Sequence, residues 1–165
     1  MLVNEAALFE IIQDTWISTL GFQVDLATSP EFSPIEAFTV CVKITGAWDG
    51  EVRLHCPLQL ARLIAAAIFQ EKPDHAGSDE ILDALSELIH IIGGNLKALL
   101  PQPVTLSFPS LLDPTNWAQT TPQWQLVCRL TLISEGHLFV VTLLGGLCSG
   151  ANAETPTACE SQWPA

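Results

Sequence analysis

The sequence predicts an α+β domain, in which an antiparallel sheet built from two hairpins carries helices packed on it. Two pairs of apolar, β-rich segments are each joined by a short turn containing glycine and acidic residues, as in hairpins. Segments with apolar residues at helical spacing precede and separate these pairs. With 165 residues, of which 48% are hydrophobic, the chain can bury a core without disulfides or metals.

The first helix is expected over residues 4–20, where apolar side chains recur at helical spacing. Asn4 can cap its start, and Gly21 suits its end. The following segment, FQVDLA, is a candidate for a short strand. The next segment, TSPEFSPIE, contains two prolines and is expected to be a loop.

The first hairpin is expected to pair residues 37–45 with EVRLH across the turn GAWDG, because β-branched and aromatic residues flank that turn. An alanine- and leucine-rich helix is expected directly afterwards. Pro57 is expected at its first helical position, where the missing N–H removes no hydrogen bond.

A long helix is expected to follow and to end at Pro101. Ser78 or Asp79 can cap its start, and the acidic residues of its first turn suit the positive end of the helix. Two adjacent glycines, Gly93 and Gly94, lie inside it. Each glycine costs about 1 kcal/mol relative to alanine in a helix interior, so their presence needs a reason.

The C-terminal part predicts a strand over residues 103–109, a loop over residues 110–122, and a second hairpin after it. The first strand of this hairpin alternates apolar and polar residues, as a half-buried strand does. The apolar positions are Leu126, Cys128, Leu130 and Leu132. Residues 1–147 are expected to form one domain, and residues 148–165 a flexible tail.

The charge balance limits the partners of the chain. Eighteen acidic residues against six basic ones give a formal net charge of -12. This excess argues against binding nucleic acid or an anionic membrane, which both need clustered Lys and Arg. It favours protein partners with basic rims.

The five cysteines and the N-terminal segment indicate the cellular compartment in which the protein is expected. The cysteines form no CxxC pair, so neither a disulfide framework nor a cysteine zinc site is favoured. Cys41, Cys56 and Cys128 lie in apolar segments and are expected to be core residues in a reducing compartment. The N-terminus has no basic region typical of a signal peptide, and no apolar run is long enough to span a bilayer. A cytoplasmic protein is expected.

The long helix has two unlike faces. At 100° per residue, its leucines and isoleucines fall on one side. The opposite side is predicted to carry Asp83, Ser86, Glu87, His90, Gly94 and Lys97. Asn95 projects about 80° away from Glu87 around the helix. Glycine at position 94 removes the side chain that would hold a partner away, whereas Gly93 lies near the buried stripe, where close packing is a sufficient reason.

Two other interpretations fit this polar face. Such side chains on an outer helix face are often only solvated. Alternatively, Asp83, Glu87 and His90 have a spacing that could reach one metal ion, and Glu-x-x-His is half of the di-iron motif. That site needs a second copy on another helix, which the sequence does not supply, so no metal site is predicted. The sequence also contains no GxSxG, P-loop, GxGxxG or HExxH motif.

The long helix resembles the signature of the CheX-type chemotaxis phosphatases, within the CheC/CheX/FliY group, which reads approximately E-x-x-N-M-I-x-G-N-x-K. This chain has ELIHIIGGNLK over residues 87–97. Downstream, VTLSFPSLL resembles the strand that follows in the family, with its S-x-P step at Ser107 and Pro109. Upstream, residues 45–69 resemble the family's hairpin and helix. The resemblance covers about residues 5–146 and implies a CheX-like fold.

The resemblance implies a phosphatase for the aspartyl phosphate of a CheY-like response-regulator receiver. It implies no cofactor of its own, because the receiver carries the Mg²⁺, and it makes a homodimer joined through sheet edges expected. In the family the helix enters the receiver site, its acid engages a receiver lysine, and its asparagine orients the attacking water. Phosphoryl transfer gains mostly from such positioning and charge stabilisation.

By this correspondence Glu87 matches the catalytic acid, and Gly94 and Asn95 match the family's Gly-Asn pair. Asp83, Gly94, Asn95 and Lys97 are expected to bind the partner. Position 90 departs from the family, because His90 replaces the asparagine. Neutral imidazole also offers one donor and one acceptor, but its protonated form cannot accept a hydrogen bond from water. Two functions therefore stay open: a phosphatase that uses Glu87 and His90, or a non-catalytic receiver-binding or flagellar-switch-like module.

Overall fold

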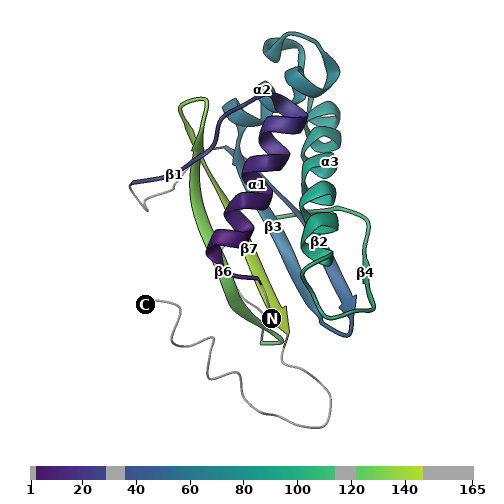
Figure 1. Ribbon diagram of the computed structural model, residues 1–165. Coiled ribbons are helices and arrows are strands. Elements are labelled where there is room, and N and C mark those ends of the chain that lie inside the picture. The colour runs from purple at the N-terminus through teal and green to yellow at the C-terminus, as the bar shows by residue number, and fades with distance from the viewer. Residues whose placement is uncertain (1–2, 29–35, 114–121, 147–165) are drawn as a thin grey trace.

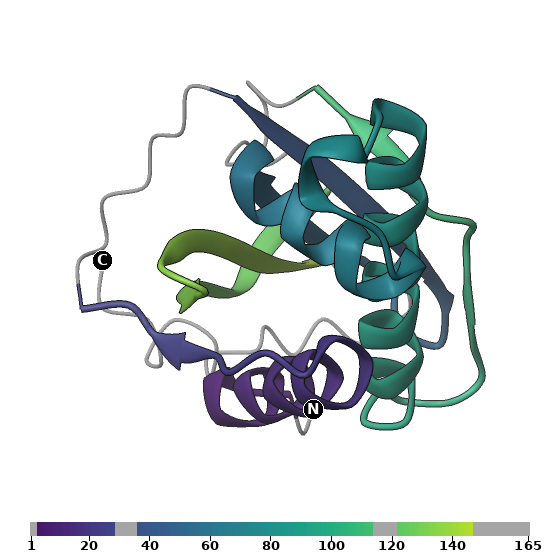
Figure 2. The ribbon, with the colours of Figure 1, turned by 90° about the horizontal axis from the view of Figure 1, so that it is seen from above.

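The computed structural model describes residues 3–28, 36–113 and 122–146. The expected α+β class is confirmed: an antiparallel sheet carries three α-helices on one side (Figures 1 and 2). The helices are α1 (Glu5–Leu20), α2 (Leu58–Phe69) and α3 (Ser78–Lys97), with a 3₁₀ turn, η1, at Pro73–His75. The strands are β1 (Asp25–Leu26), β2 (Ala37–Gly46), β3 (Gly50–Pro57), β4 (Val104–Leu106), β5 (Ser110–Leu112), β6 (Trp124–Ser134) and β7 (His137–Gly146).

The two expected hairpins, β2–β3 and β6–β7, form the centre of the sheet and join through antiparallel pairing of β3 with β7. The strand order is β1-β6-β7-β3-β2-β4, and β5 also pairs with β2. A register shift between Leu126 and Cys128 interrupts the predicted alternation of β6. Cys128, Leu130 and Leu132 are buried as expected, but Leu126 is only half-buried and Val127 is buried in addition.

The segment after α3 differs from the expectation. The single strand expected over residues 103–109 is shortened to β4, because the Ser107 hydroxyl accepts a hydrogen bond from the Lys43 N–H (2.9 Å) and Pro109 has no N–H for the ladder. The first part of the expected loop is instead β5, where Ser110 pairs with Cys41. The backbone of β5 thereby satisfies groups of β2 that lie beyond the end of β4.

The ends of α1 and the start of α2 can be compared with the capping residues expected from the sequence. Asn4 caps α1 as expected, since its Oδ1 accepts a hydrogen bond from the Ala7 N–H (2.9 Å), and Gly21 ends the helix with φ 72. Pro57, in contrast, is not the first residue of α2. It pairs with Ala37 in extended backbone at the end of β3, one residue before the helix.

The expected boundaries of α3 were also wrong at both ends. Ser78 does not cap the helix but is its first residue; the Glu80 carboxylate accepts a hydrogen bond from the Gly77 N–H (2.7 Å) instead. The helix ends at Lys97, before Pro101. A final bond from the Leu100 N–H to the Lys97 carbonyl (3.3 Å) tightens the chain after it.

One continuous core lies between the helices and the sheet. α1 packs toward β6 and α3 toward β2, and all three helices contact one another. Trp16 stacks on Phe139 at a centroid distance of 4.7 Å, which ties α1 to β7. The buried residues of α3 are Ile81, Ala84, Leu85, Leu88, Ile89, Ile92, Gly93 and Leu96. The leucine and isoleucine stripe predicted from the sequence is therefore the packing face.

The other side of the three central strands is polar as well as buried. We call this surface the rear face; its buried residues on β2, β3 and β7 are Thr39, Cys41, Glu51, Arg53, His55, Val140, Thr142 and Leu144. They alternate along their strands with residues of the main core and lie outside it. Within the rear face Arg53 pairs with Glu51, and the Thr39 hydroxyl lies 2.6 Å from Nδ1 of His55.

The three cysteines expected in the core are buried and free, but only Cys56 and Cys128 belong to the main core, whereas Cys41 lies on the rear face. Burial raises the pKa of the Cys41 thiol to about 11 and that of Cys128 to about 12. Both therefore carry inert thiols at neutral pH. No helix among the described residues is long and apolar enough to cross a membrane. The expected tail, residues 148–165, lies outside the described residues.

Candidate functional site

The outer face of α3 is the candidate site. Asp83, Glu87, His90, Gly94 and Asn95 are exposed, and Lys97 is half-buried at the end of the helix. These are the six residues singled out from the sequence. Asp83, Glu87 and Gly94 lie along one line because they are spaced by four and seven residues. His90 and Lys97 lie to one side of that line, and Asn95 lies to the other.

None of the polar side chains on this face is engaged by the rest of the described structure. Among the described residues, Asp83, Glu87, His90, Asn95 and Lys97 make no side-chain hydrogen bond or ion pair. They are also not arranged as a metal centre, since no group of three His, Cys, Asp or Glu side chains in the described ranges is placed to hold an ion. The carboxylates and the imidazole are therefore available to a group from outside the chain.

The two glycines of α3 have different surroundings. A Cβ at Gly94 would have no heavy atom within 4 Å, so the space above it is open. A Cβ at Gly93 would lie 3.5 Å from Cγ1 of Val42 and 3.6 Å from Cδ1 of Leu106, which are ordinary van der Waals distances. Gly93 faces the sheet, as expected, but an alanine would fit there. Packing therefore requires glycine at neither position.

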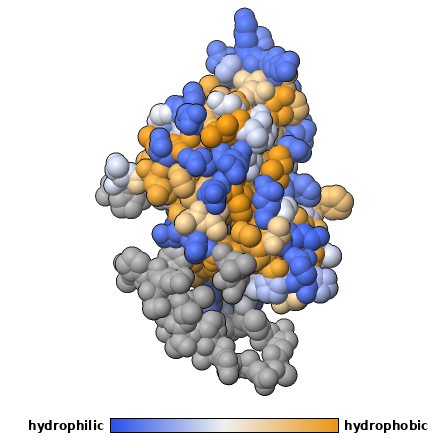
Figure 3. Space-filling view, in the orientation of Figure 1, coloured by the Kyte–Doolittle hydropathy of each residue, from blue (hydrophilic) through white to orange (hydrophobic). Residues whose placement is uncertain are grey.

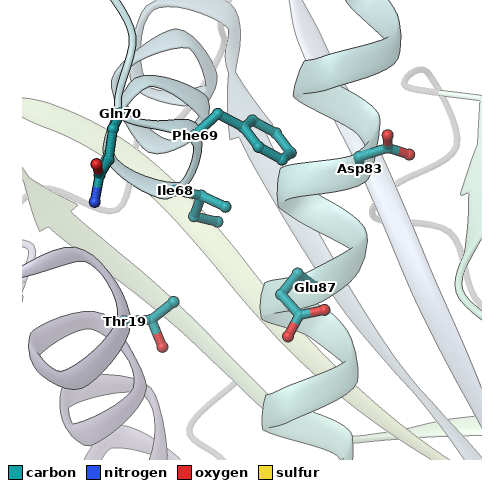
Figure 4. A pocket seen from close by; sticks show the side chains of 7 residues that line it. Thr19, Ile68, Phe69, Gln70, Asp83 and Glu87 are labelled. Atoms are coloured by element: carbon teal, nitrogen blue, oxygen red, sulfur yellow. The ribbon is translucent and has the colours of Figure 1, made fainter.

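A groove opens beside the acidic residues, between the ends of α1 and α2 and the first half of α3 (Figure 4). It encloses about 550 Å³. Its lining consists of Thr19, Ala67, Ile68, Phe69, Gln70, Asp83 and Glu87. Figure 4 shows the Phe69 ring directed from α2 toward α3, where Asp83 and Glu87 lie one turn apart.

The groove was missed from the sequence, although Asp83 and Glu87 were singled out. The missing part is the end of α2, whose apolar residues resemble those of any packed helix. Phe69 nevertheless remains 45% exposed. Figure 3 shows apolar surface between hydrophilic side chains on the helix-covered side of the molecule. The one local signal is that Phe69 is the last apolar residue of its helix, directly before the polar segment QEKPDH, so it stands at the edge of the helical layer.

The fold and this helix define an α+β protein that presents acidic and polar side chains on an exposed helix. The family model for the chemotaxis phosphatase CheX matches residues 38–130, more than half of the chain and including all of α3. The chain belongs to the CheX family. A sequence comparison with curated proteins gives no match.

Solved structures agree with this family. The chemotaxis protein CheX from Desulfovibrio desulfuricans superposes with a TM-score of 0.64 at 15% identity, over 85% of this chain and 97% of that one. CheX from Borrelia burgdorferi, in its complex with CheY, BeF₃ and Mg²⁺, gives a TM-score of 0.64 at 13% identity, over 88% and 98% of the two chains. FliY from Thermotoga maritima gives 0.54 at 18% identity, over 88% and 92%. At these identities the likeness shows the fold.

Proposed function

We propose that this protein removes the phosphoryl group from the aspartyl phosphate of a CheY-like receiver in chemotaxis or related two-component signalling. The observation that carries the proposal is the unengaged pair Glu87 and His90 on the outer face of α3, beside open space at Gly94, in a chain of the CheX family. The neighbouring CheX that was crystallised with CheY supports a receiver as the partner.

In this mechanism α3 supplies position and charge. The Glu87 carboxylate accepts a hydrogen bond from a receiver lysine and so fixes the helix in the receiver site. Neutral His90 accepts a hydrogen bond from a water and holds it in line with phosphorus. The water oxygen forms the new bond to phosphorus, the bond to the receiver carboxylate breaks, and the released proton goes to solvent. The Mg²⁺ required belongs to the receiver, and the chain needs no cofactor of its own.

The remaining groups on the face serve docking in this proposal. Asp83, Asn95 and Lys97 contact the receiver around the site, and Gly94 lets the receiver backbone approach the helix. Since receivers act in the cytoplasm, the protein acts there too. We further propose a homodimer formed through a sheet edge. Among the described residues, β1 pairs only with the end of β6, at Leu132 and Ile133, which leaves the outer side of the rest of β6 for a second copy.

The test is phosphate release from a phosphorylated receiver of the same organism. Glu87→Ala should abolish any acceleration over the receiver alone, and Gly94→Leu should weaken receiver binding. Because Glu87 is exposed, the substitution should change stability by less than about 0.5 kcal/mol. Glu10→Ala, which removes an exposed acid from α1, is the matched control and should retain full activity. Full activity of Glu87→Ala would refute this assignment of the site.

A second function rests on one specific departure from the family. His90 stands where the CheX signature has asparagine, so the same face could bind a receiver without turnover, as an interaction module. The likeness to FliY, and to FliM from Helicobacter pylori in its complex with SpeE, at a TM-score of 0.52, fits this alternative. Tight binding of the phosphorylated receiver with no gain in phosphate release would establish the module and exclude the phosphatase.

A further inference from the structure

The groove beside Glu87 has an apolar wall that the fold does not cover. Phe69 and Ile68 stand at the last turn of α2, and the Phe69 side chain remains 45% exposed next to two carboxylates. An exposed phenylalanine forgoes the gain of burial in its own core. A hollow with an aromatic wall and a few polar groups is the usual form of a recognition pocket.

The helix that carries Phe69 ends directly after it, in an uncommon backbone conformation. Gln70 directly follows it with φ 54 and ψ 48, a left-handed conformation that glycine adopts most readily. The Gln70 N–H bonds to the Ala66 carbonyl, and the Glu71 N–H reaches the same carbonyl at 3.2 Å. These bonds end α2 at Phe69, directly before Gln70, which also lines the groove. A non-glycine residue in this conformation costs about 1 kcal/mol or more and is often found at functional sites.

The charges of the lining select the occupant. Asp83 and Glu87 contribute two carboxylates, and within residues 3–28, 36–113 and 122–146 no basic side chain lines the groove. A second copy of this chain is a poor occupant, because each copy carries a formal net charge of -12 with only six basic residues. A partner that places an apolar side chain next to a lysine or arginine matches both the wall and the acidic edge.

We propose that the groove is a docking pocket for the receiver, which inserts a bulky apolar side chain against Phe69 and Ile68 while a neighbouring basic side chain pairs with Asp83 or Glu87. The inference rests on the proposed receiver partner, and it adds a structural feature by which this protein selects that receiver. Because Glu87 belongs both to the groove and to the face that enters the receiver, filling the groove sets the position of α3 over the phosphoryl group.

The test is calorimetric binding of a CheY-like receiver loaded with beryllofluoride and Mg²⁺, with two matched variants. Phe69→Ser removes the apolar wall, and Ile17→Ser removes an equally exposed apolar side chain of α1 that does not line the groove; both side chains are 45% exposed. Phe69→Ser should weaken binding about tenfold. Ile17→Ser should change it by less than about twofold. Phe69→Leu keeps an apolar wall and should retain most of the affinity, which separates docking from damage to α2.

The outcomes separate the groove from the proposed function. If the receiver binds and Phe69→Ser behaves like Ile17→Ser, the groove is not the docking pocket, while the receiver remains the partner. If Phe69→Leu loses as much affinity as Phe69→Ser although both are folded by circular dichroism, the contact is not a general apolar one and the proposal fails. If the unaltered protein binds no receiver, the proposed function and the docking role fall together.

Discussion

The rear face of the sheet and the outer face of α3 both carry acids, bases and a histidine, but they treat them in opposite ways. On the rear face Glu51 and Arg53 are paired and only 3% and 7% exposed, and His55 is hydrogen-bonded to Thr39. On α3, Glu87 and His90 are exposed and have no side-chain partner among the described residues. The polar groups of the rear face are held by contacts within the fold, whereas no contact among the described residues accounts for Glu87 and His90 on α3.

This difference separates stability from function. Buried polar groups need their partners, because an unpaired one loses its hydration without compensation. Exposed and unpaired groups contribute little to stability and can be changed almost freely. Substitutions on the rear face should therefore act on folding, and substitutions on α3 should act on receiver chemistry.

The largest effect is expected from the buried ion pair. Arg53→Met leaves the Glu51 carboxylate buried without its charge partner, so the free energy of unfolding should fall by about 3–5 kcal/mol. Urea denaturation followed by circular dichroism measures this. The double variant Glu51→Leu/Arg53→Met removes both charges and should be more stable than the single one. Equal stability of the single and double variants would mean that other contacts of Arg53 carry the effect.

His55 should give the rear face a pH dependence of its own. Burial lowers the pKa of His55 from its ordinary value of 6.5 to about 4. Because the unfolded chain then takes up this proton more readily than the folded one, stability should fall as the pH drops from about 6.5 to about 4, by up to about 3 kcal/mol. His55→Gln can keep a hydrogen bond to Thr39 but does not titrate. A smaller loss of stability in this variant over the same pH range is the expected result, and an identical loss would assign it to carboxylates elsewhere.

The sequence predicted the outer face of α3 but not the rear face, and the physical origin of each face explains this difference. Helical periodicity placed Glu87 and His90 opposite the leucine stripe, because an amphipathic helix separates its faces by spacing alone. The rear face was not predicted, because burial of both sides of a strand depends on what packs over each side, and the spacing of residues within the strand does not give that. The groove was missed for the same reason, since Phe69 meets Asp83 only after α2 packs on α3.

The histidine on α3 should affect the rate and leave stability unchanged. If His90 holds the attacking water, His90→Ala should slow phosphate release from the receiver, because a methyl group cannot accept a hydrogen bond from that water. His90→Asn keeps a hydrogen-bond acceptor at this position and should keep or raise the rate. If the unaltered protein is inactive and His90→Asn gains activity, the natural protein is a receiver-binding module without catalysis. If His90→Asn and His90→Ala both match the parent, His90 is only solvated and the water is held elsewhere.

The smallest effect on stability is expected at the two adjacent glycines of α3. Gly93 lies on the inner side of this helix and Gly94 on its outer side, so the two positions can be compared directly. Gly93→Ala places a methyl group at van der Waals distance from Val42 and Leu106, and Gly94→Ala places one in open space. Each substitution should raise the free energy of unfolding by about 1 kcal/mol, because alanine is the better helix former. Only the change at Gly94 should also weaken receiver binding, since only that methyl group stands where a partner would approach. Paired measurements of thermal unfolding and receiver affinity on the two variants make the comparison. If both variants gain stability and bind the receiver equally well, the glycines do not serve close approach, and the contact face on α3 lies elsewhere.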